Sequence, residues 1–569
     1  MLKKSLAFFL IFIFVSAYAT EIWSEDIQTP QTPIDDSKQP YTRDDVYRQL
    51  ELFSTALSYV LGNYRENLTK EQLEKVMSEA IRGMLQGLGD RYSFYQEETS
   101  RKREQENLFF AKFGGIGIRI LPSPDGFVYV VQPMDGSPAM KAGLHSGDKI
   151  LAVDGKSIEN QALEDVVNII RGEVGTKVTL TILRQGIDSP FDVVVTRAII
   201  NYPSVKSTII DKNIGYISIS DFTAETATEL NKSIEELRGK GMKGLILDLR
   251  GNSGGMLTSA VDVSSTFISE GLIVSTDGRL DRFDAEYRAT AKEKLDKDFV
   301  KYTTSIPLIL LVNNGSASGS EIVAGAIKDH KRGLLIGERT FGKGVVQQRF
   351  PLDENRAVSI TVSIYKTPNG NWIHEKDLFS VDVNMQKELD EGKIPEGLRQ
   401  EFANNKIPLS GSATIKTKDR IRNKGVRWQI NDGENIYTVK KEEGKIKISQ
   451  GGVNPDIEVE QPNLLEDSGD SDAVKMLTKF YEGEYVNKFV YDYVEKHKEQ
   501  SPEEQLNGLL GKMPELMKTL SDNGITLSER IVRMYVRRTF SSTQSAPNID
   551  LENDLQLARA VEEITKQIK

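Results

Sequence analysis

Two apolar runs in the middle of the chain have the form of buried strands, and each is followed by a helical segment. The runs are Leu245–Leu249 and Pro307–Val312, and the helical segments are Leu257–Ser269 and Glu321–His330. Strands that are apolar on both faces are typical of sheets covered by helices on both sides. The pattern therefore predicts an α/β core, a mixed sheet flanked by helices, over residues 200–378.

The rest of the chain must form further domains, because 569 residues are too many for one hydrophobic core. Residues 43–110 show helical periodicity, with Val46, Leu50 and Phe53 at spacings of three and four. After residue 462 an acidic linker leads into charge-rich sequence of helical character. The sequence thus predicts a multidomain α/β protein with helical regions at both ends.

The first residues have the pattern of an export signal. Lys3 and Lys4 precede the apolar run Leu6–Val15, and Ala17 and Ala19 give the small-x-small pattern of a cleavage site. The apolar run is short for a membrane span. We therefore expect a signal peptide over 1–19 and an exported protein, periplasmic or otherwise extracytoplasmic. An uncleaved signal would instead associate the protein with a membrane.

Composition excludes several classes of function. The net charge of −10 argues against nucleic acid as a partner. The absence of cysteine excludes disulfides, thiolate metal sites and cysteine nucleophiles. The four histidines are scattered along the chain, which argues against a histidine-rich metal site. We therefore expect neither a metal nor a cofactor.

Residues 111–199 contain glycine-rich strings, and the order of these strings resembles a PDZ domain. Such domains bind a C-terminal peptide as an added strand, and a glycine loop presents backbone N–H groups to its carboxylate. The resemblance places this loop at Gly115, Ile116, Gly117 and Ile118, where the isoleucines would favour apolar tails. Alternatively, the glycines only permit a tight strand entry. The strings are Ala142-Gly143-Leu144, Gly147-Asp148-Lys149-Ile150 and Val153-Asp154-Gly155.

Three serines, Ser316, Ser318 and Ser320, lie between a predicted buried strand and a helix. A serine at such a turn stands clear of the sheet, and the helix N-terminus stabilises negative charge. Lys343 follows Ser318 by 25 residues, and Gln347 comes four residues later. This stretch, preceded by a PDZ-like unit, resembles the C-terminal processing peptidases, which are serine proteases that use lysine as the base.

The resemblance implies that Ser318 is the nucleophile, Lys343 the base and Gln347 the residue that orients the amine. A lysine base must be neutral, and burial lowers the pKa of an amine. If a strand begins at Lys343, then Lys343, Val345 and Gln347 point the same way. In the competing interpretation, Ser318 and Glu321 form a Ser-x-x-Glu capping box and Lys343 is a solvated loop residue.

An oxyanion hole needs two convergent N–H donors. The resemblance assigns one to Gly319, directly after the nucleophile, and the other to Gly254 in preference to Gly255. We expect Asp248 and Arg250, which precede this glycine loop, to brace it.

Two other functions compete with this one. The segment Gly251–Gly255 also resembles the nucleophile loop of trypsin-like proteases that carry PDZ domains, with Ser253 as nucleophile. That reading lacks an upstream histidine other than His145, which lies inside the PDZ-like unit. The second alternative is a non-catalytic PDZ scaffold on a peptidase fold. His330 is a poor base for Ser318, because about 18 Å of helix separates them.

The resemblance covers roughly residues 43–376 and 450–460, although residues 88–93 lack the family's usual Asp-Pro. The last strand of the core arrives about 80 residues late, so an insertion is expected. The resulting reading is an exported, PDZ-gated Ser-Lys endopeptidase that cleaves proteins near free, apolar C-termini; an oligomer is compatible with it. The expected parts are a signal peptide (1–19), a linker (20–42), an N-terminal helical region (43–110), a PDZ domain (111–199), the peptidase core (200–378), an insertion (379–449), a return strand (450–461) and a C-terminal helical region (462–569).

Overall fold

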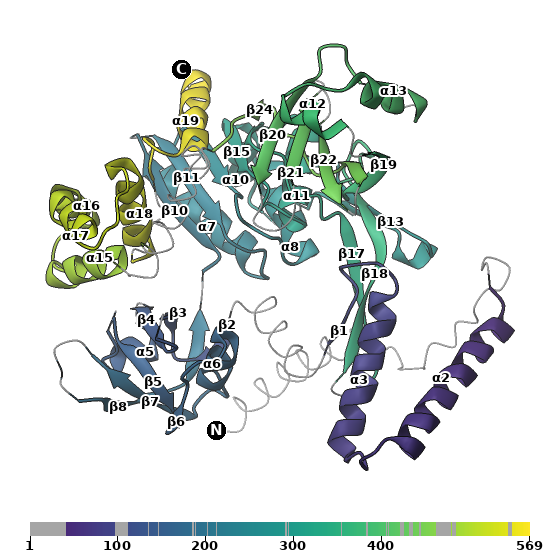
Figure 1. Ribbon diagram of the computed structural model, residues 1–569. Coiled ribbons are helices and arrows are strands. Elements are labelled where there is room, and N and C mark those ends of the chain that lie inside the picture. The colour runs from purple at the N-terminus through teal and green to yellow at the C-terminus, as the bar shows by residue number, and fades with distance from the viewer. Residues whose placement is uncertain are drawn as a thin grey trace, which may run out of the picture. The chain divides into compact units, whose positions relative to one another are not determined.

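The computed structural model of the chain describes residues 41–96, 112–461, 480, 485–543 and 549–568 (Figure 1). Within these ranges it leaves out short stretches at 124, 135, 146, 185–186, 188, 202, 212, 291–292, 294, 354–355, 383–384, 406, 408, 421–425, 432–435 and 443–444. The predicted signal peptide, nearly all of the predicted linker and the start of the C-terminal region lie outside the described residues. The chain divides into two units, Met1–Met84 and Leu85–Lys569.

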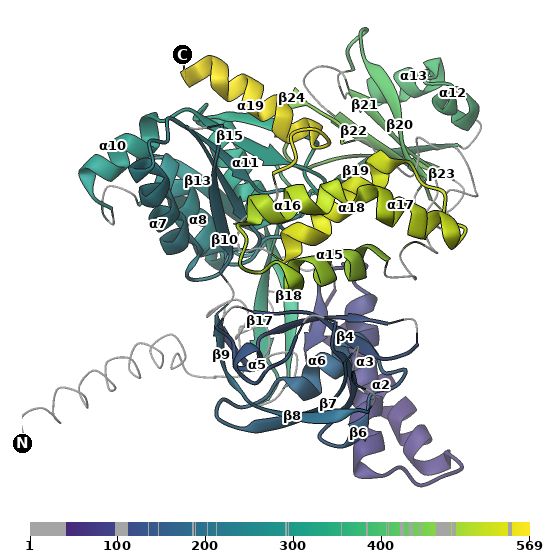
Figure 2. The same cartoon turned by 90° about the vertical axis from the view of Figure 1, so that its left-hand side faces the viewer.

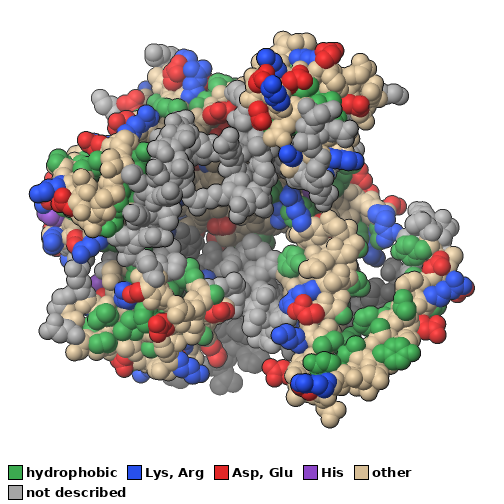
Figure 3. Space-filling view, viewed as in Figure 1, with side chains coloured by type: hydrophobic (Ala, Val, Ile, Leu, Met, Phe, Trp, Pro, Cys, Tyr) green, Lys and Arg blue, Asp and Glu red, His purple; other side chains and the backbone are tan. Residues whose placement is uncertain are grey.

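The first unit contains helix α2 (Arg43–Asn63) and most of α3 (Lys70–Gln86). Helix α2 begins at a capping box, because Thr42 accepts from the Asp45 N–H and the Asp45 carboxylate accepts from the Thr42 N–H. No side chain of α2 is buried, and most of its large apolar residues are exposed (Figure 3). Of the helices that the structure describes, none is long and apolar enough to span a bilayer.

The PDZ-like unit is a strongly bent antiparallel sheet with two short helices. Strand β3 lies at one edge of the sheet and pairs only with β4 among the described strands, in the order β3-β4-β5-β7-β8. The unit has its own apolar core, to which α6 contributes Val166 and Ile170. Its elements are β3 (Ile118–Pro122), β4 (Val128–Pro133), α5 (Pro138–Lys141), β5 (Lys149–Val153), β6 (Lys156–Ser157), α6 (Leu163–Ile170), β7 (Lys177–Leu183) and β8 (Phe191–Thr196). Strands β2 (Lys112–Gly115) and β9 (Ala198–Asn201) pair antiparallel where the chain enters and leaves the PDZ-like unit.

The core is a six-stranded sheet in the order β10-β11-β12-β15-β16-β24, with β10 antiparallel to β11 and the other pairs parallel. Alternate residues of β12 enter two apolar layers: Leu245 and Leu247 face α7, α8 and α11, and Ile246 faces α19. The predicted mixed sheet flanked by helices is confirmed (Figures 1 and 2). The elements are β10 (Val205–Ile210), β11 (Ile214–Ile219), α7 (Thr226–Gly239), β12 (Gly244–Asp248), α8 (Leu257–Phe267), α10 (Lys297–Ser305), β15 (Leu308–Val312), α11 (Gly319–Asp329), β16 (Leu334–Gly337), β24 (Ile457–Glu458) and α19 (Leu555–Ile568).

A second sheet carries the predicted hairpin. Its strands β17 and β18 pair antiparallel, and β18 also pairs with β1 and β13. The register of β17 shifts between Val346 and Gln347. The strands are β1 (Phe94–Gln96), β13 (Leu272–Gly278), β14 (Ala285–Arg288), β17 (Val345–Pro351) and β18 (Ala357–Lys366).

The predicted insertion forms an antiparallel sheet in the order β19-β23-β22-β21-β20, with a core of its own around Trp428 and Tyr437. This sheet extends from Lys376 to Gln450, so it begins slightly before residue 379. Four helices near the C-terminus also share a separate core. These elements are β19 (Lys376–Asp382), α12 (Gln386–Asp390), α13 (Glu396–Asn404), β20 (Thr414–Arg420), β21 (Val426–Asn431), β22 (Ile436–Glu442), β23 (Lys445–Gln450), α15 (Tyr485–Lys496), α16 (Pro502–Gly511), α17 (Met513–Asp522) and α18 (Glu529–Ser542).

Candidate active site

Ser318 lies at the turn between β15 and α11, where the chain changes direction at the end of a buried strand. Its backbone is left-handed, with φ 52° and ψ −112°. A serine in such a conformation costs on the order of 1–3 kcal/mol, which the surrounding structure must supply. Its side chain is half-buried, whereas Ser316 and Ser320 are fully buried. Ser318 is therefore the serine of the three that solvent or a substrate can reach.

The other two serines hold this turn against the glycine loop that follows β12. The Ser316 hydroxyl donates to the Leu249 carbonyl and the Ser320 hydroxyl to the Asn252 carbonyl, each at 2.8 Å. The Ala317 N–H also donates to the Asn252 carbonyl, at 3.0 Å. The two loops are thus fixed to one another by hydrogen bonds on both sides of Ser318.

Gly254, the residue predicted to supply an oxyanion donor, lies directly beside Ser318. A Cβ at Gly254 would come 2.6 Å from the Ser318 Cβ and 3.1 Å from the Gly319 nitrogen, and the φ of Gly254 is 113°. Only glycine fits this position. The Gly254 N–H donates to Oδ1 of Asn252 at 2.9 Å, however, so an oxyanion would have to share it.

Gly319 is the first residue of α11, so its N–H has no acceptor within the helix. The N-terminal end of a helix also carries partial positive charge. Gly319 therefore offers a donor to an anion formed next to Ser318.

Glu321 joins the nucleophile candidate to the base candidate. Its Oε2 accepts from the Ser318 N–H at 2.9 Å and from the Lys343 N–H at 2.8 Å. Its Oε1 accepts from the Gly342 N–H at 2.6 Å and from the Thr340 hydroxyl at 2.5 Å. The carboxylate is fully buried, and burial raises its pKa to about 7 although each of these donors favours the anion.

The Ser-x-x-Glu pattern predicted a cap at this position, and Glu321 does cap the backbone of Ser318. No sequence pattern predicted that the same carboxylate reaches Lys343, which is 22 residues further along.

Lys343 lies in the loop between β16 and β17, so the condition that a strand begins at Lys343 is not met. Strand β17 begins at Val345, and its register shift separates Val345 from Gln347, so the predicted alternation does not hold. Gly344 is confined, because a Cβ there would overlap the backbone of His374. A side chain at this position would therefore collide with the backbone of His374.

Tyr92 lies next to both Lys343 and Gln347. The Lys343 Nζ is 5.5 Å from the centre of the Tyr92 ring, and the Gln347 side-chain amide donates to the Tyr92 carbonyl. The Arg91 guanidinium lies 4.9 Å from the same ring centre. Burial raises the pKa of Tyr92. The base candidate is thus half-buried against an aromatic ring with a second cation close by.

Two further residues of this region were missed from the sequence. Tyr365 of β18 is buried; burial raises the pKa of its phenol, and the neighbouring Ser318 side chain opposes the rise. The His374 ring meets the Tyr92 ring edge-on at 5.9 Å, and burial lowers the pKa of His374. Neither residue belongs to a recognisable local motif, so only the fold reveals their position.

The predicted tail-binding loop of the PDZ-like unit, Gly115–Ile118, contains a turn at Gly117. Gly117 has φ 74°, and a Cβ there would lie 2.5 Å from the Ser137 Cβ. Ile116 is 1% exposed and packs in the core of the PDZ-like unit, so the expectation that its side chain meets a peptide tail is wrong. Gly115 is buried before it, and Ile118 begins the edge strand β3.

Two histidines that bear on the trypsin-like alternative have other partners. His145 lies in the PDZ-like unit, where its backbone N–H donates to the Asp148 carboxylate at 2.8 Å. His330 ends α11 at the opposite end from Ser318, and its Nε2 bonds the Leu272 carbonyl at 2.7 Å. Within the described residues, no group of three or more His, Asp or Glu side chains could hold a metal ion.

The model of peptidase family S41 matches residues 213–384, and the model of the PDZ domain matches residues 129–184. A carboxy-terminal-processing protease of Bartonella bacilliformis is 39% identical over 335 residues, 58% of this chain and 73% of that protein. The carboxy-terminal processing protease CtpA of Bacillus subtilis is 33% identical over 459 residues, 79% of this chain and 92% of that protein. This chain belongs to the carboxy-terminal processing proteases of family S41.

Membership of this family supports a peptidase activity, and the PDZ domain supports binding of a peptide. Among solved structures, the photosystem II D1 C-terminal processing protease is similar, with 29% identity and a TM-score of 0.33. That similarity covers 57% of this chain and 83% of that one.

Proposed function

We propose that this carboxy-terminal processing protease is a serine endopeptidase in which Ser318 is the nucleophile and Lys343 the general base. The observation that carries the proposal is the Glu321 carboxylate, whose Oε2 binds the backbone of both residues. A nucleophile and its base must be held in a fixed relationship for proton transfer, and this shared carboxylate constrains both at the main chain.

The chemistry divides into two steps. Neutral Lys343 takes the proton of the Ser318 hydroxyl while the oxygen attacks the scissile carbonyl, and the resulting ammonium returns the proton to the leaving amine. Water then attacks the acyl-enzyme with the same amine as base, and Ser318 leaves with its proton restored. Developing charge on the carbonyl oxygen would be met by the Gly319 N–H, the α11 N-terminus and the shared Gly254 N–H.

Gln347 would act on the base through Tyr92. Its amide is bonded to the Tyr92 carbonyl, and the Tyr92 ring lies beside the Lys343 amine. In this proposal Gln347 is a positioning residue. Partial burial and the Arg91 cation beside the same ring favour the neutral form of the amine.

The PDZ domain would select substrates by their C-termini. Strand β3 is the edge of its sheet, so an extended tail can add to it, with the loop at Gly115–Ile118 facing the terminal carboxylate. We further propose that the protein is exported, given the signal-like pattern at residues 1–19. In the competing case of a scaffold without activity, the tail would bind and no bond would be cleaved.

A fluorophosphonate probe tests the nucleophile directly. The intact protein is incubated with the probe, digested and mapped by mass spectrometry; modification is expected on Ser318. Modification of Ser253 would favour the trypsin-like alternative, and the absence of any modified serine, with tail binding retained, would favour the scaffold.

A further inference from the structure

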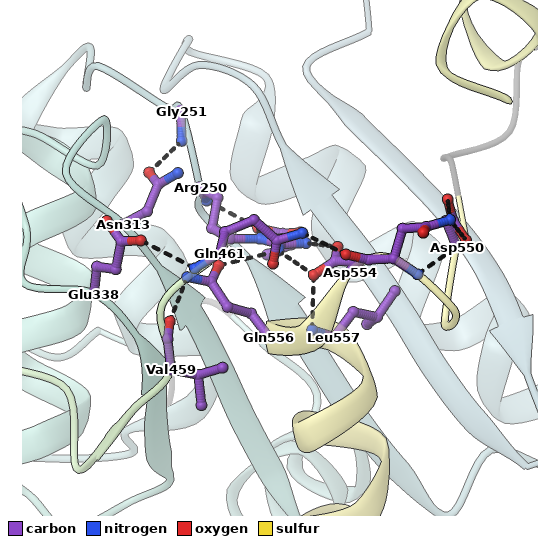
Figure 4. Close-up of polar contacts among 12 residues, drawn as sticks. Arg250, Gly251, Asn313, Glu338, Val459, Gln461, Asp550, Asp554, Gln556 and Leu557 are labelled. Atoms are coloured by element: carbon purple, nitrogen blue, oxygen red, sulfur yellow. Dashed lines mark hydrogen bonds and ion pairs between the residues drawn. The ribbon is translucent and has the colours of Figure 1, made fainter. Parts of the chain in front are cut away.

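A largely buried ion pair joins the glycine loop of the candidate site to a segment near the C-terminus, which contains Asp554. The Arg250 guanidinium donates to both oxygens of Asp554 at 2.7 Å, across 304 positions of sequence (Figure 4). The side chains of Arg250 and Asp554 are 16% and 20% exposed. A two-point pair of this kind fixes orientation as well as distance.

The same guanidinium also holds the end of β12. It donates to both oxygens of Asp248, the shortest contact being 2.6 Å, and Asp248 in turn accepts from the Tyr216 hydroxyl at 2.6 Å. The prediction that Asp248 and Arg250 brace the loop is therefore confirmed. Arg250 lies between two carboxylates, one from the sheet and one from the segment before α19.

The C-terminal side of the pair is anchored to the core independently. The Gln556 amide donates to the Val459 carbonyl at 2.8 Å, and the Gln461 amide donates to the Asn553 carbonyl at 2.7 Å (Figure 4). Asp554 also accepts from the Leu557 N–H at 2.9 Å, at the start of α19. The apolar face of α19, with Leu557 and Ile564, packs on the core sheet. Asp554 is therefore a fixed point for Arg250.

Four residues after Arg250, the glycine loop reaches Ser318. Gly251, next to Arg250, donates its N–H to Oδ1 of Asn313 at 3.0 Å, and Gly254 lies against the Ser318 Cβ. A shift of Arg250 would therefore move the part of the glycine loop that carries the Gly254 N–H donor.

We propose that Asp554 is a positioning residue for the glycine loop that carries the Gly254 donor. Through Arg250, the segment Asp550–Leu557 and helix α19 hold this loop in the geometry that the catalytic step requires. The inference rests on the proposed function of Ser318 and adds to it a dependence on sequence outside the matched peptidase region. No residue of this segment needs to touch the substrate.

The test compares three variants of the full chain. Asp554→Asn keeps the shape but removes the charge, and Asp554→Glu keeps the charge. Glu563→Gln is the matched control, because Glu563 is 15% exposed and its ion pairs in the described structure lie within α19, with Arg559 and Lys566. Thermal unfolding is measured for each, and kcat and KM are measured with a short peptide well below the unfolding transition.

Removing one oxyanion donor costs about 100-fold or more in rate, so a displaced donor is expected to cost less. Asp554→Asn should lower kcat about tenfold with little change in KM, and it should lower the rate of fluorophosphonate labelling in parallel. Asp554→Glu, which keeps the charge, should retain part of the lost activity. Glu563→Gln should keep the kcat of the parent. If Asp554→Asn unfolds earlier but keeps its kcat and labelling rate, the pair is only structural and the inference is wrong.

The two proposals fail separately. If Ser318→Ala retains full activity, the proposed function is wrong whatever Asp554 does. If Ser318→Ala is inactive and Asp554→Asn is normal, only the positioning role is wrong.

Discussion

Ser318 and Lys343 donate their backbone N–H groups to the same atom, Oε2 of Glu321, at 2.9 and 2.8 Å. The two residues come from different loops, one before α11 and one before β17. Their main chains are therefore held together by a single carboxylate that is fully buried. The separation of the two main chains is therefore set by a group inside the core.

Ser318→Ala should abolish proteolysis without altering the fold. Loss of the nucleophile from a triad costs about 10⁶-fold in rate. Peptide cleavage is measured together with circular dichroism, and Ser253→Ala is the control because Ser253 is exposed in the neighbouring loop. An inactive Ser253→Ala beside an active Ser318→Ala would show that the trypsin-like reading is right.

Lys343→Arg should be as inactive as Lys343→Ala. Arginine keeps the positive charge but does not lose its proton at any working pH. Initial rates are compared from pH 6 to 9, where the parent should gain activity as the pH rises and more of the amine becomes neutral. Lys328→Arg, at a lysine paired with Asp456, serves as control. Substantial turnover by Lys343→Arg would exclude lysine as the base.

The buried Glu321 should make stability depend on pH. Burial raises its pKa from 4.5 to about 7, so the folded protein binds a proton that the unfolded chain releases between these values. The stabilising contribution is complete below pH 4.5 and declines by about 3 kcal/mol as the pH rises to about 7.

Urea unfolding at pH 5, 6, 7 and 8 measures this contribution. In Glu321→Gln the decline should disappear, while the variant is less stable overall because an amide presents an N–H₂ group to some of the backbone donors. If parent and variant have parallel pH profiles, Glu321 is not the titrating group.

Amidation of a good substrate's C-terminus should weaken cleavage at least several-fold, roughly as expected for removing a charge that backbone N–H groups bind. Free-acid and amidated peptides of the same sequence are compared by kcat/KM. Gly117→Ala should reduce the difference, because its φ of 74° and the Ser137 side chain leave no room for a Cβ. Equal cleavage of both peptides by the parent would mean that the PDZ domain does not select tails.

The core could be predicted from sequence because its signals are local. Neighbouring residues are enough to recognise the apolar runs at β12 and β15 and the helices that follow them. The same holds for the hairpin β17–β18. The strand predicted from Val345 is present, and Lys343 precedes it in a loop. The close approach of Gly344 to His374 could not be predicted, because His374 is distant in sequence.

The same reasoning explains what was missed at the site. Glu321 could be found as a cap from the Ser-x-x-Glu spacing, but its bond to Lys343 arises only when two loops meet. Tyr92 and Asp554 carry no motif at all, and each contributes through a partner hundreds of positions away: Gln347 for Tyr92 and Arg250 for Asp554. Contacts of this range depend on the topology of the sheet.

The order of the core strands has a consequence for biosynthesis. Strand β24 adds to the sheet beside β16 only after the whole inserted domain, and α19 covers the second face later still. Until residues 457–458 and 555–568 have been made, one sheet edge and one apolar face have no cover, and Arg250 has no Asp554 to bind. On the proposed roles of Ser318, Lys343 and Asp554, a nascent chain would contain the nucleophile and the base before it contains the residue that positions the glycine loop beside them.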